Sequence, residues 1–245
     1  MLKRSLIFIY GMACYAVFLA TFLYALGFVG NFFVPRAIDG APRVDLATAL
    51  LTDLGLLLLF ALQHSVMARP AFKRWLTRFV PEPAERSTYV LASSVALIVL
   101  FVLWQPLGGV VWSVAAPWSG VLYAAFGFGW GLVLVSTFLI NHFDLFGLRQ
   151  IWLQLRCTPY THLGFGTPGP YKLIRHPLYL GWFFAFWATP LMTATHLLFA
   201  LATTGYILIA IQLEERDLLA ALGDDYRRYR DRVPMIIPFA RGRRA

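Results

Sequence analysis

The sequence predicts an all-α integral membrane protein, and three observations support that prediction. Hydrophobic residues make up 59% of the 245 residues and charged residues only 13%, whereas roughly 25% of residues are charged in a soluble domain. The mean hydropathy is +0.66. Continuous apolar runs fill most of the chain and leave no polar block large enough for a second domain. We therefore expect a single membrane domain over residues 1–245, with N-terminal spans in 1–141 and a loop, a helical hairpin and a tail in 142–245.

Four apolar runs are long enough to cross a hydrocarbon core of about 30 Å, which takes about 20 helical residues. Their length favours helices over the alternating stretches of about ten residues that form membrane barrels. The first run follows Lys3 and Arg4 but exceeds the apolar region of a cleaved signal, and no convincing cleavage pattern follows it, so we expect it to stay attached as an anchor. The four runs cover residues 5–29, 46–67, 87–105 and 118–141.

A fifth apolar run, over residues 178–213, is too long for one untilted span. The Thr189-Pro190 step and a polar group interrupt this run near its middle, so we interpret it as a helical hairpin, which gives five to six spans in all. The polar group consists of Thr193, Thr195 and His196.

Small residues in the fourth run predict close helix packing. Gly127, Gly129 and Gly131 include a pair four residues apart, a spacing that lets a neighbouring helix approach closely.

The distribution of positive charge predicts the orientation of the chain. Lys and Arg collect in cytoplasmic loops of membrane proteins. With the N-terminus in the cytosol, all but Arg36 and Arg43 of the 21 Lys and Arg residues fall on the cytosolic side. We therefore expect both termini in the cytosol. The net charge of +9 then reflects basic loops beside anionic lipid headgroups, and we expect no nucleic-acid partner.

Cysteine and histidine give no sign of a disulfide or metal framework. Cys14 lies within the first span and Cys157 in a cytosolic loop, on different levels of the bilayer. The five histidines lack the spacing of a zinc site, so we expect no bound metal.

Polar residues converge at the cytosolic side of the predicted topology. Distant segments that meet at one depth suggest a functional site, although helix ends are polar in general, which lowers the weight of each group taken alone. Four groups are involved: Gln63-His64-Ser65, Asn141-His142-Phe143-Asp144, the loop from Thr158 to Pro177, and Glu214-Glu215.

The loop contains six residues, 164–169, that match the pattern G-x-G-x-x-G. A dinucleotide-binding fold needs a strand before these glycines and a helix after them, whereas this loop runs from a polar segment into Pro170 and Tyr171. We therefore interpret the glycines as positions where the backbone can approach a ligand closely.

The segment 175–181 predicts one end of a ligand site. Pro177 suits the first turn of a helix, and the free amide groups of such a helix end can hold a carboxylate. The hairpin would bring Glu214 and Glu215 back beside this segment, so that a ligand with both a carboxylate and an ammonium group fits between them. Adjacent residues point about 100° apart on a helix, so we expect one glutamate to face the ligand while the other meets solvent or an arginine.

These residues carry a resemblance to a known superfamily. Gly169-Pro170-Tyr171, Arg175-His176-Pro177-x-Tyr179-x-Gly181, Glu214-Glu215, Tyr226-x-x-Tyr229 and Val233-Pro234 resemble the C-terminal region of the isoprenylcysteine carboxyl methyltransferase and phospholipid methyltransferase superfamily. The resemblance implies that residues 142–245 form a cofactor region, which holds S-adenosyl-L-methionine in a helical pocket within the membrane. The implied cofactor-binding residues are Gly164, Phe165, Gly166, Tyr171, Arg175, His176, Pro177, Tyr179, Gly181, Glu214 and Glu215.

The N-terminal half narrows the resemblance. Residues 63–70 and 141–150 are similar to segments of the bacterial methanethiol S-methyltransferase family. This similarity implies methyl transfer from S-adenosyl-L-methionine to the sulfur of methanethiol, which gives dimethyl sulfide. It also implies a small volatile thiol and membrane lipids as partners, no protein partner, and an active site at the cytosolic face of a bacterial inner membrane.

Such a reaction requires a thiolate. A small alkyl thiol has a pKa at or above about 8.5, so only a few per cent is ionised at neutral pH, and a histidine is the natural base. We expect His142 to be the base, with Asp144 orienting it if the helix ends or kinks at Phe143, and His64 as the alternative base. Arg149 would pair with Asp144 or with the cofactor carboxylate.

Other functions remain open from the residues alone. The terminal segment with Tyr226 and Arg230 could cap the pocket, but we interpret it as an interfacial helix with a basic face. The same scaffold could serve a methyltransferase for a lipid or prenyl-cysteine acceptor, or a membrane reductase that uses NADPH, which Lys172 and Arg175 do not exclude. A non-enzymatic assembly or transport protein is a third class, although transport predicts paired charges near the membrane midplane and only Asp53 approaches that description.

Overall fold

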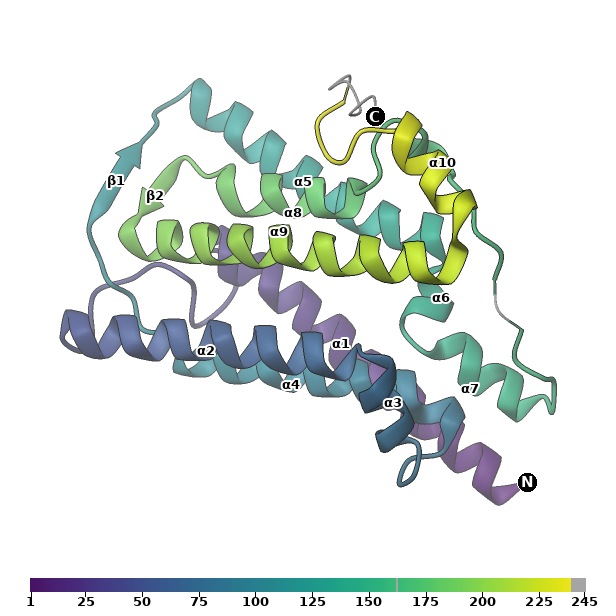
Figure 1. Cartoon of the computed structure of the whole chain (residues 1–245). Helices are drawn as coiled ribbons and strands as arrows, with labels where there is room; N and C mark the ends of the chain where they lie inside the picture. Colours follow the sequence, from purple (N-terminus) through teal and green to yellow (C-terminus); the bar gives the residue numbers. More distant parts are fainter. Residues whose placement is uncertain (162, 239–245) are drawn as a thin grey trace. The chain divides into compact units, whose positions relative to one another are not determined.

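The computed structural model describes residues 1–161 and 163–238, which form helices joined by loops and one small sheet (Figure 1). The α-helices are α1 (Leu2–Gly30), α2 (Leu46–Met67), α3 (Pro70–Leu76), α4 (Glu85–Leu103), α5 (Trp118–Ile140), α6 (His142–Leu145), α7 (Leu148–Leu155), α8 (Pro177–Trp187), α9 (Ala194–Leu222) and α10 (Asp224–Arg232). Two 3-10 turns, Glu82–Ala84 and Gly169–Lys172, and two strands, β1 (Val110–Ser113) and β2 (Leu191–Thr193), complete the described structure.

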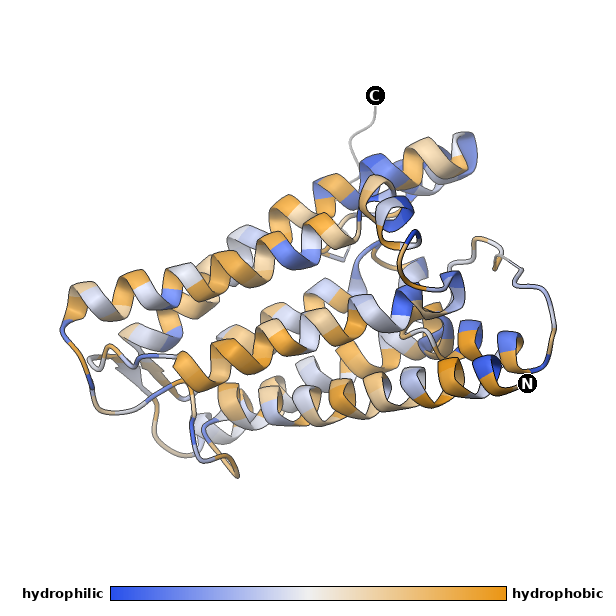
Figure 2. Ribbon diagram, turned by 90° about the horizontal axis from the view of Figure 1, so that it is seen from below, coloured by the Kyte–Doolittle hydropathy of each residue, from blue (hydrophilic) through white to orange (hydrophobic). Residues whose placement is uncertain are grey.

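Five of these helices, α1, α2, α4, α5 and α9, are long and apolar enough to cross a membrane. Large apolar side chains such as Leu58, Leu62 and Phe138 are more than half exposed on them, as expected for surfaces that contact lipid rather than water. Apolar colour runs along the long helices, and much of the hydrophilic colour gathers at their ends and in the connecting segments (Figure 2). The predicted all-α integral membrane class is confirmed.

The fifth apolar run folds as the predicted hairpin, with a difference in the lengths of its two helices. The first helix, α8, has 11 residues and so spans only about 17 Å, which is shorter than a hydrocarbon core of about 30 Å. Residues 188–193, which include β2, continue the chain from α8 to the start of α9. The second, α9, has 29 residues and continues beyond the end of the apolar run at residue 213, so that Glu214 and Glu215 lie within the helix. It stops at Gly223, whose positive φ of 57° is easily adopted by glycine and not by other residues.

The described chain forms two compact units. The first contains residues 1–110, 141–161 and 193–196. Within it α4 packs against α1 and α2, and α7 packs against α1. A Cβ atom on Gly11 of α1 would lie 2.4 Å from Ile151 of α7, so the absence of a side chain there allows this close contact. Both residues are buried. The organisation of the chain as a single domain stays a prediction.

The second unit contains residues 111–140, 163–192 and 197–238. Here α5 packs against α8 at two facing glycines. A Cβ atom on Gly129 would lie 2.7 Å from the carbonyl oxygen of Gly181, and one on Gly181 would lie 2.8 Å from the carbonyl oxygen of Gly129. Close helix packing in the fourth apolar run is confirmed at Gly129, but the prediction was wrong for the pair four residues apart, because a Cβ on Gly127 or Gly131 would meet nothing within 4 Å.

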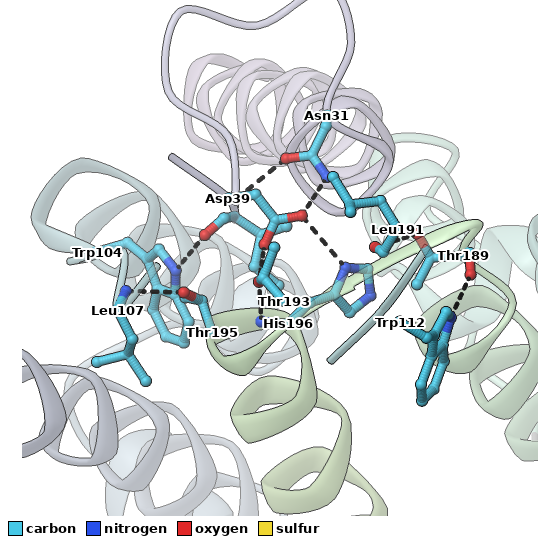
Figure 3. Close-up of polar contacts among 11 residues, drawn as sticks. Asn31, Asp39, Trp104, Leu107, Trp112, Thr189, Leu191, Thr193, Thr195 and His196 are labelled. Atoms are coloured by element: carbon cyan, nitrogen blue, oxygen red, sulfur yellow. Dashed lines mark hydrogen bonds and ion pairs between the residues drawn. The ribbon is translucent and has the colours of Figure 1, made fainter. Parts of the chain in front are cut away.

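Strands β1 and β2 pair in a two-stranded sheet, which the sequence analysis did not predict. Residues 110–112 are Val-Val-Trp, and β-branched and aromatic residues favour strands, so the local signal was present in an uncharged loop. The Trp112 indole N–H also donates to the Thr189 carbonyl at 3.1 Å (Figure 3). This contact joins β1 to the segment between α8 and β2.

A polar network in the first unit fixes the loop after α1 to the start of α9 (Figure 3). The Asp39 carboxylate accepts a hydrogen bond from the Asn31 amide at 2.7 Å and another from the Thr193 hydroxyl. The oxygen that accepts from Asn31, Oδ2, also lies 3.7 Å from Nδ1 of His196. The His196 side chain is 1% exposed. We interpret this cluster as structural, because its hydrogen bonds connect parts of the fold to one another.

Candidate active site

A buried carboxylate organises the predicted cofactor region, and it belongs to Glu215 on α9. Its Oε1 accepts hydrogen bonds from Nε of Arg175 at 2.7 Å and from Nε2 of His176 at 3.0 Å. The neighbouring Glu214 is exposed and accepts a hydrogen bond from the Tyr179 hydroxyl at 2.9 Å. The two glutamates therefore differ in their surroundings, since Glu215 meets an arginine and Glu214 is exposed beside the first turns of α8. That one of them faces the ligand stays a prediction.

The Arg175-His176 pair also holds the C-terminal segment in place. The Arg175 guanidinium donates to the carbonyl oxygens of Arg230 at 2.9 Å and Val233 at 2.6 Å. The backbone N–H groups of Arg175 and His176 donate to the carbonyl oxygens of Pro234 and Met235. The contacts of Arg175 that the structure shows are thus internal, which indicates that this cation supports the site rather than presenting itself to a ligand.

Three aromatic rings join the glycine-containing loop to α10. Phe165 lies 6.0 Å from Tyr226 and 5.5 Å from Tyr229 between ring centroids. Both tyrosines are more than nine-tenths buried, so α10 docks against its own unit, in contrast to the interpretation of this segment as a simple interfacial helix. A Cβ on Gly164 or Gly166 would meet nothing within 4 Å, so both loop glycines border open space.

The remaining predicted cofactor residues lie in or near the same part of the second unit. Tyr171 is in the turn before α8, and its carbonyl accepts a hydrogen bond from the Tyr229 hydroxyl at 2.6 Å. Burial raises the pKa of Tyr171, and the nearby Glu214 carboxylate adds to that rise. Pro177 begins α8 as expected. Gly181 packs against α5, and this helix contact is enough to explain the glycine.

The predicted catalytic residues belong to the first unit, and His142 is the most enclosed of them. His142 is the first residue of α6, and it is 4% exposed. Its Nε2 lies 2.7 Å from the Tyr15 hydroxyl, and the ring centroids of His142 and Phe146 are 4.7 Å apart. Burial lowers the pKa of His142, so the imidazole is neutral at pH 7 and able to accept a proton. The helix break occurs at Asn141, whose φ is 143°, two residues before Phe143, where the break was expected.

Asp144 has partners other than the histidine it was expected to orient. Its carboxylate accepts a hydrogen bond from Arg149 at 3.0 Å and another from the Tyr160 hydroxyl at 3.2 Å. Arg149 also donates to the carbonyl oxygen of Thr161 at 2.9 Å. Of the two pairings left open for Arg149, the structure shows the one with Asp144, and this pair anchors the segment after α7.

His64, the alternative base, sits in a second polar group. The Tyr89 hydroxyl lies 2.9 Å from its Nε2, and the Ser93 hydroxyl lies 3.1 Å from its Nδ1. Arg86 connects the two histidine environments, because its guanidinium lies 5.2 Å from the Tyr89 ring centre and donates to the carbonyl oxygen of Leu145 at 2.7 Å.

Sequence reasoning missed the residues that position the two histidines. Tyr15 is separated from His142 by 127 residues, and Tyr89 and Arg86 come from the third apolar run and its start. The only signal in the sequence was the presence of hydroxyl-bearing aromatic residues within apolar spans. Among residues 1–161 and 163–238 no three His, Cys, Asp or Glu side chains gather as a metal site would require.

Comparison with known proteins identifies relatives over nearly the full length of the chain. The methanethiol S-methyltransferase of Crocosphaera subtropica is 55% identical over 239 residues, which are 97% of this chain and 94% of that protein. The methanethiol S-methyltransferase of Mycobacterium tuberculosis is 56% identical over 239 residues, 97% of this chain and 98% of that protein. Nurim of Sus scrofa is 32% identical over 182 residues, 68% of this chain and 66% of that protein. No family model and no solved structure matches the chain.

Proposed function

Because this chain belongs to the methanethiol S-methyltransferase family, we propose that it transfers the methyl group of S-adenosyl-L-methionine to the sulfur of methanethiol and so forms dimethyl sulfide. The observation that carries this proposal is the identity of 55–56% with proteins of that name over 97% of the chain. Similarity of this extent includes both the C-terminal cofactor region and the histidine-bearing segments of the N-terminal half.

We propose that the methyl donor is held by the cluster around Glu215. The exposed Glu214 carboxylate suits an ammonium group, and the free amide groups at the start of α8 suit a carboxylate. Arg175, His176 and Glu215 would act as the frame that fixes these groups, because their hydrogen bonds are satisfied within the protein. The buried hydroxyl of Tyr226, which has no hydrogen-bond partner among residues 1–161 and 163–238, also fits a bound polar ligand.

His142 is the proposed base. Its neutral imidazole takes the proton from the thiol sulfur, and the resulting thiolate is the nucleophile. When bound, S-adenosyl-L-methionine supplies a methyl group on a sulfonium sulfur, which passes to the thiolate and leaves S-adenosylhomocysteine. The Tyr15 hydroxyl, 2.7 Å from Nε2, holds the ring in position. His64 is the alternative base, with Tyr89 in the corresponding place.

The location of the reaction follows from charge. All but Arg36 and Arg43 of the 21 Lys and Arg residues lie on one side of the proposed topology, so that both termini and the cofactor region face the cytosol. We propose the inner membrane of a bacterium as the site of the protein, with anionic lipids beside the basic loops.

The test is headspace gas chromatography over the purified protein supplied with S-adenosyl-L-methionine and methanethiol, with a control that lacks the methyl donor. Dimethyl sulfide formed only in the complete mixture is the expected result. Protein that binds the donor in calorimetry but forms no dimethyl sulfide would point to a larger acceptor, such as a lipid or prenyl-cysteine. In the same calorimetry Glu214→Ala should weaken donor binding, and an unchanged affinity would exclude the proposed role of Glu214.

A further inference from the structure

The hydroxyl of Tyr226 has no hydrogen-bond partner among the residues that the structure describes. Tyr226 lies on α10, its side chain is 2% exposed, and its hydroxyl oxygen is shielded from solvent. A buried hydroxyl without a partner costs about 1–3 kcal/mol. Such an atom in a folded protein calls for a partner beyond the residues that the structure describes.

The neighbouring Tyr229 shows what a purely structural tyrosine looks like in this helix. It lies one turn further along α10, it is also buried, and its ring is 5.8 Å from that of Tyr226. Its hydroxyl donates to the carbonyl oxygen of Tyr171 at 2.6 Å. The two tyrosines therefore share a helix, burial and the Phe165 contact, and they differ in whether the described part of the chain supplies a partner for the hydroxyl.

The surroundings of the Tyr226 hydroxyl are charged. Burial raises the pKa of Tyr226, and the carboxylates of Glu215 and Glu214 raise it further, while the Arg175 guanidinium lowers it. The phenol therefore stays protonated at neutral pH and can donate a hydrogen bond. Its charged neighbours are Glu214, which the proposed function assigns to the ammonium group of the methyl donor, and the Arg175–Glu215 pair that frames the same site.

We infer that the Tyr226 hydroxyl hydrogen-bonds the charged amino-acid end of the bound methyl donor, and that Tyr226 is a further cofactor-contacting residue. The inference rests on the proposed function. It gives the buried hydroxyl a partner, and it explains why α10 docks against its own unit through its tyrosine face.

The experiment compares Tyr226→Phe with the matched variant Tyr229→Phe by isothermal titration calorimetry. Two ligands are titrated into each full-length protein: S-adenosylhomocysteine, which has the amino-acid end, and 5′-methylthioadenosine, which lacks it. Because a hydrogen bond to a charged group contributes about 1.5–3 kcal/mol, Tyr226→Phe should weaken S-adenosylhomocysteine binding about 10- to 100-fold and leave methylthioadenosine binding within about twofold. Tyr229→Phe should leave both affinities within about threefold.

Thermal unfolding without ligand is a second measurement, in which Tyr229→Phe and not Tyr226→Phe should be the variant that changes. Removal of an unsatisfied hydroxyl should leave the midpoint of Tyr226→Phe equal to or above that of the wild type. Tyr229→Phe should unfold at a lower temperature, because the Tyr171 carbonyl loses its donor.

Three results would overturn the inference. An unchanged S-adenosylhomocysteine affinity in Tyr226→Phe would mean that water satisfies the hydroxyl, and an equal loss for both ligands would move the contact away from the amino-acid end. Wild-type protein that binds no S-adenosylhomocysteine would refute the proposed function together with this inference. Wild-type protein that binds it while Tyr226→Phe behaves identically refutes this inference alone.

Discussion

Replacement of Glu215 by alanine should destabilise the protein far more than the same change at the adjacent Glu214. The Glu215 carboxylate faces Arg175 at 2.7 Å, and the two side chains are only 11% and 10% exposed. Breaking a buried pair of this kind costs about 3–5 kcal/mol, because the remaining charge stays buried without its partner. A change of 1 kcal/mol shifts the midpoint of a chain of this size by roughly 2–4 °C, so Glu215→Ala should unfold about 6–20 °C below the wild type.

The assay is thermal unfolding in detergent, followed by the fluorescence of the 8 tryptophans. Glu214→Ala is the matched control, because the Glu214 side chain is exposed and surface substitutions usually change stability by less than about 0.5 kcal/mol. Limited trypsin digestion supplies a local readout. Helix α10, whose C-terminal end Arg175 holds, contains the exposed Arg227 and Arg228, and cleavage there should accelerate in Glu215→Ala.

A double-mutant cycle isolates the pair itself. Arg175→Ala, Glu215→Ala and the double variant should give a coupling energy toward the upper end of the roughly 0.5–3 kcal/mol seen for contacting residues. Equal midpoints for Glu215→Ala and Glu214→Ala, or a coupling energy near zero, would refute the assignment of Glu215 as the organising carboxylate of this cluster.

Three further predictions concern other parts of the molecule. His142→Ala should lower kcat/KM for methyl transfer about 100-fold or more at pH 7, where the base contributes, and much less at pH 10, where the thiol ionises unaided. Because burial lowers the pKa of His142, wild-type activity should fall only below about pH 6.5, the ordinary histidine value; an equal loss at both pH values would make His142 a positioning residue. Gly181→Ala should lower the thermal midpoint, because its Cβ would lie 2.8 Å from the Gly129 carbonyl oxygen, and an unchanged midpoint would show that α5 and α8 separate freely. Asp39→Ala should destabilise the protein by about 1.5–3 kcal/mol for each charged hydrogen bond lost, in chemical or thermal unfolding, and wild-type stability would contradict a structural role for the network with His196.

The membrane spans could be predicted from the sequence because the lipid environment leaves few alternatives. A run such as residues 46–67 must satisfy its backbone internally, so hydropathy alone gave bounds identical to those of α2. The hairpin was predicted for a similar local reason, since Thr189-Pro190 disfavours a continuous helix. The length of α8 could not be predicted, because it depends on where the chain meets β1, a pairing between strands about eighty residues apart.

The candidate site was predictable only where its residues lie near one another in the sequence. Arg175, His176 and Tyr179 form a short motif, and the hairpin brings the two glutamates to it. Tyr15 next to His142 could not be found in this way, because 127 residues separate them and no local pattern encodes such a contact. The pairing of His142 with Asp144 was predicted because the two residues are close in the sequence. The structure instead pairs the Asp144 carboxylate with the charged Arg149.

The structure also divides the C-terminal motif into two roles that the sequence alone presents as one. Arg175, His176 and Glu215 direct their hydrogen bonds to each other and to the tail at residues 230–235, so their charges are compensated before any ligand arrives. Glu214 is exposed, and the Tyr226 hydroxyl has no partner among the described residues. If this division is correct, changes in the first set should reduce stability and ligand affinity together, whereas changes in the second set should reduce affinity while the unfolding midpoint without ligand stays near that of the wild type. A variant such as Glu214→Gln that lowered both would place Glu214 in the frame and would leave the ammonium group of the methyl donor without its proposed carboxylate.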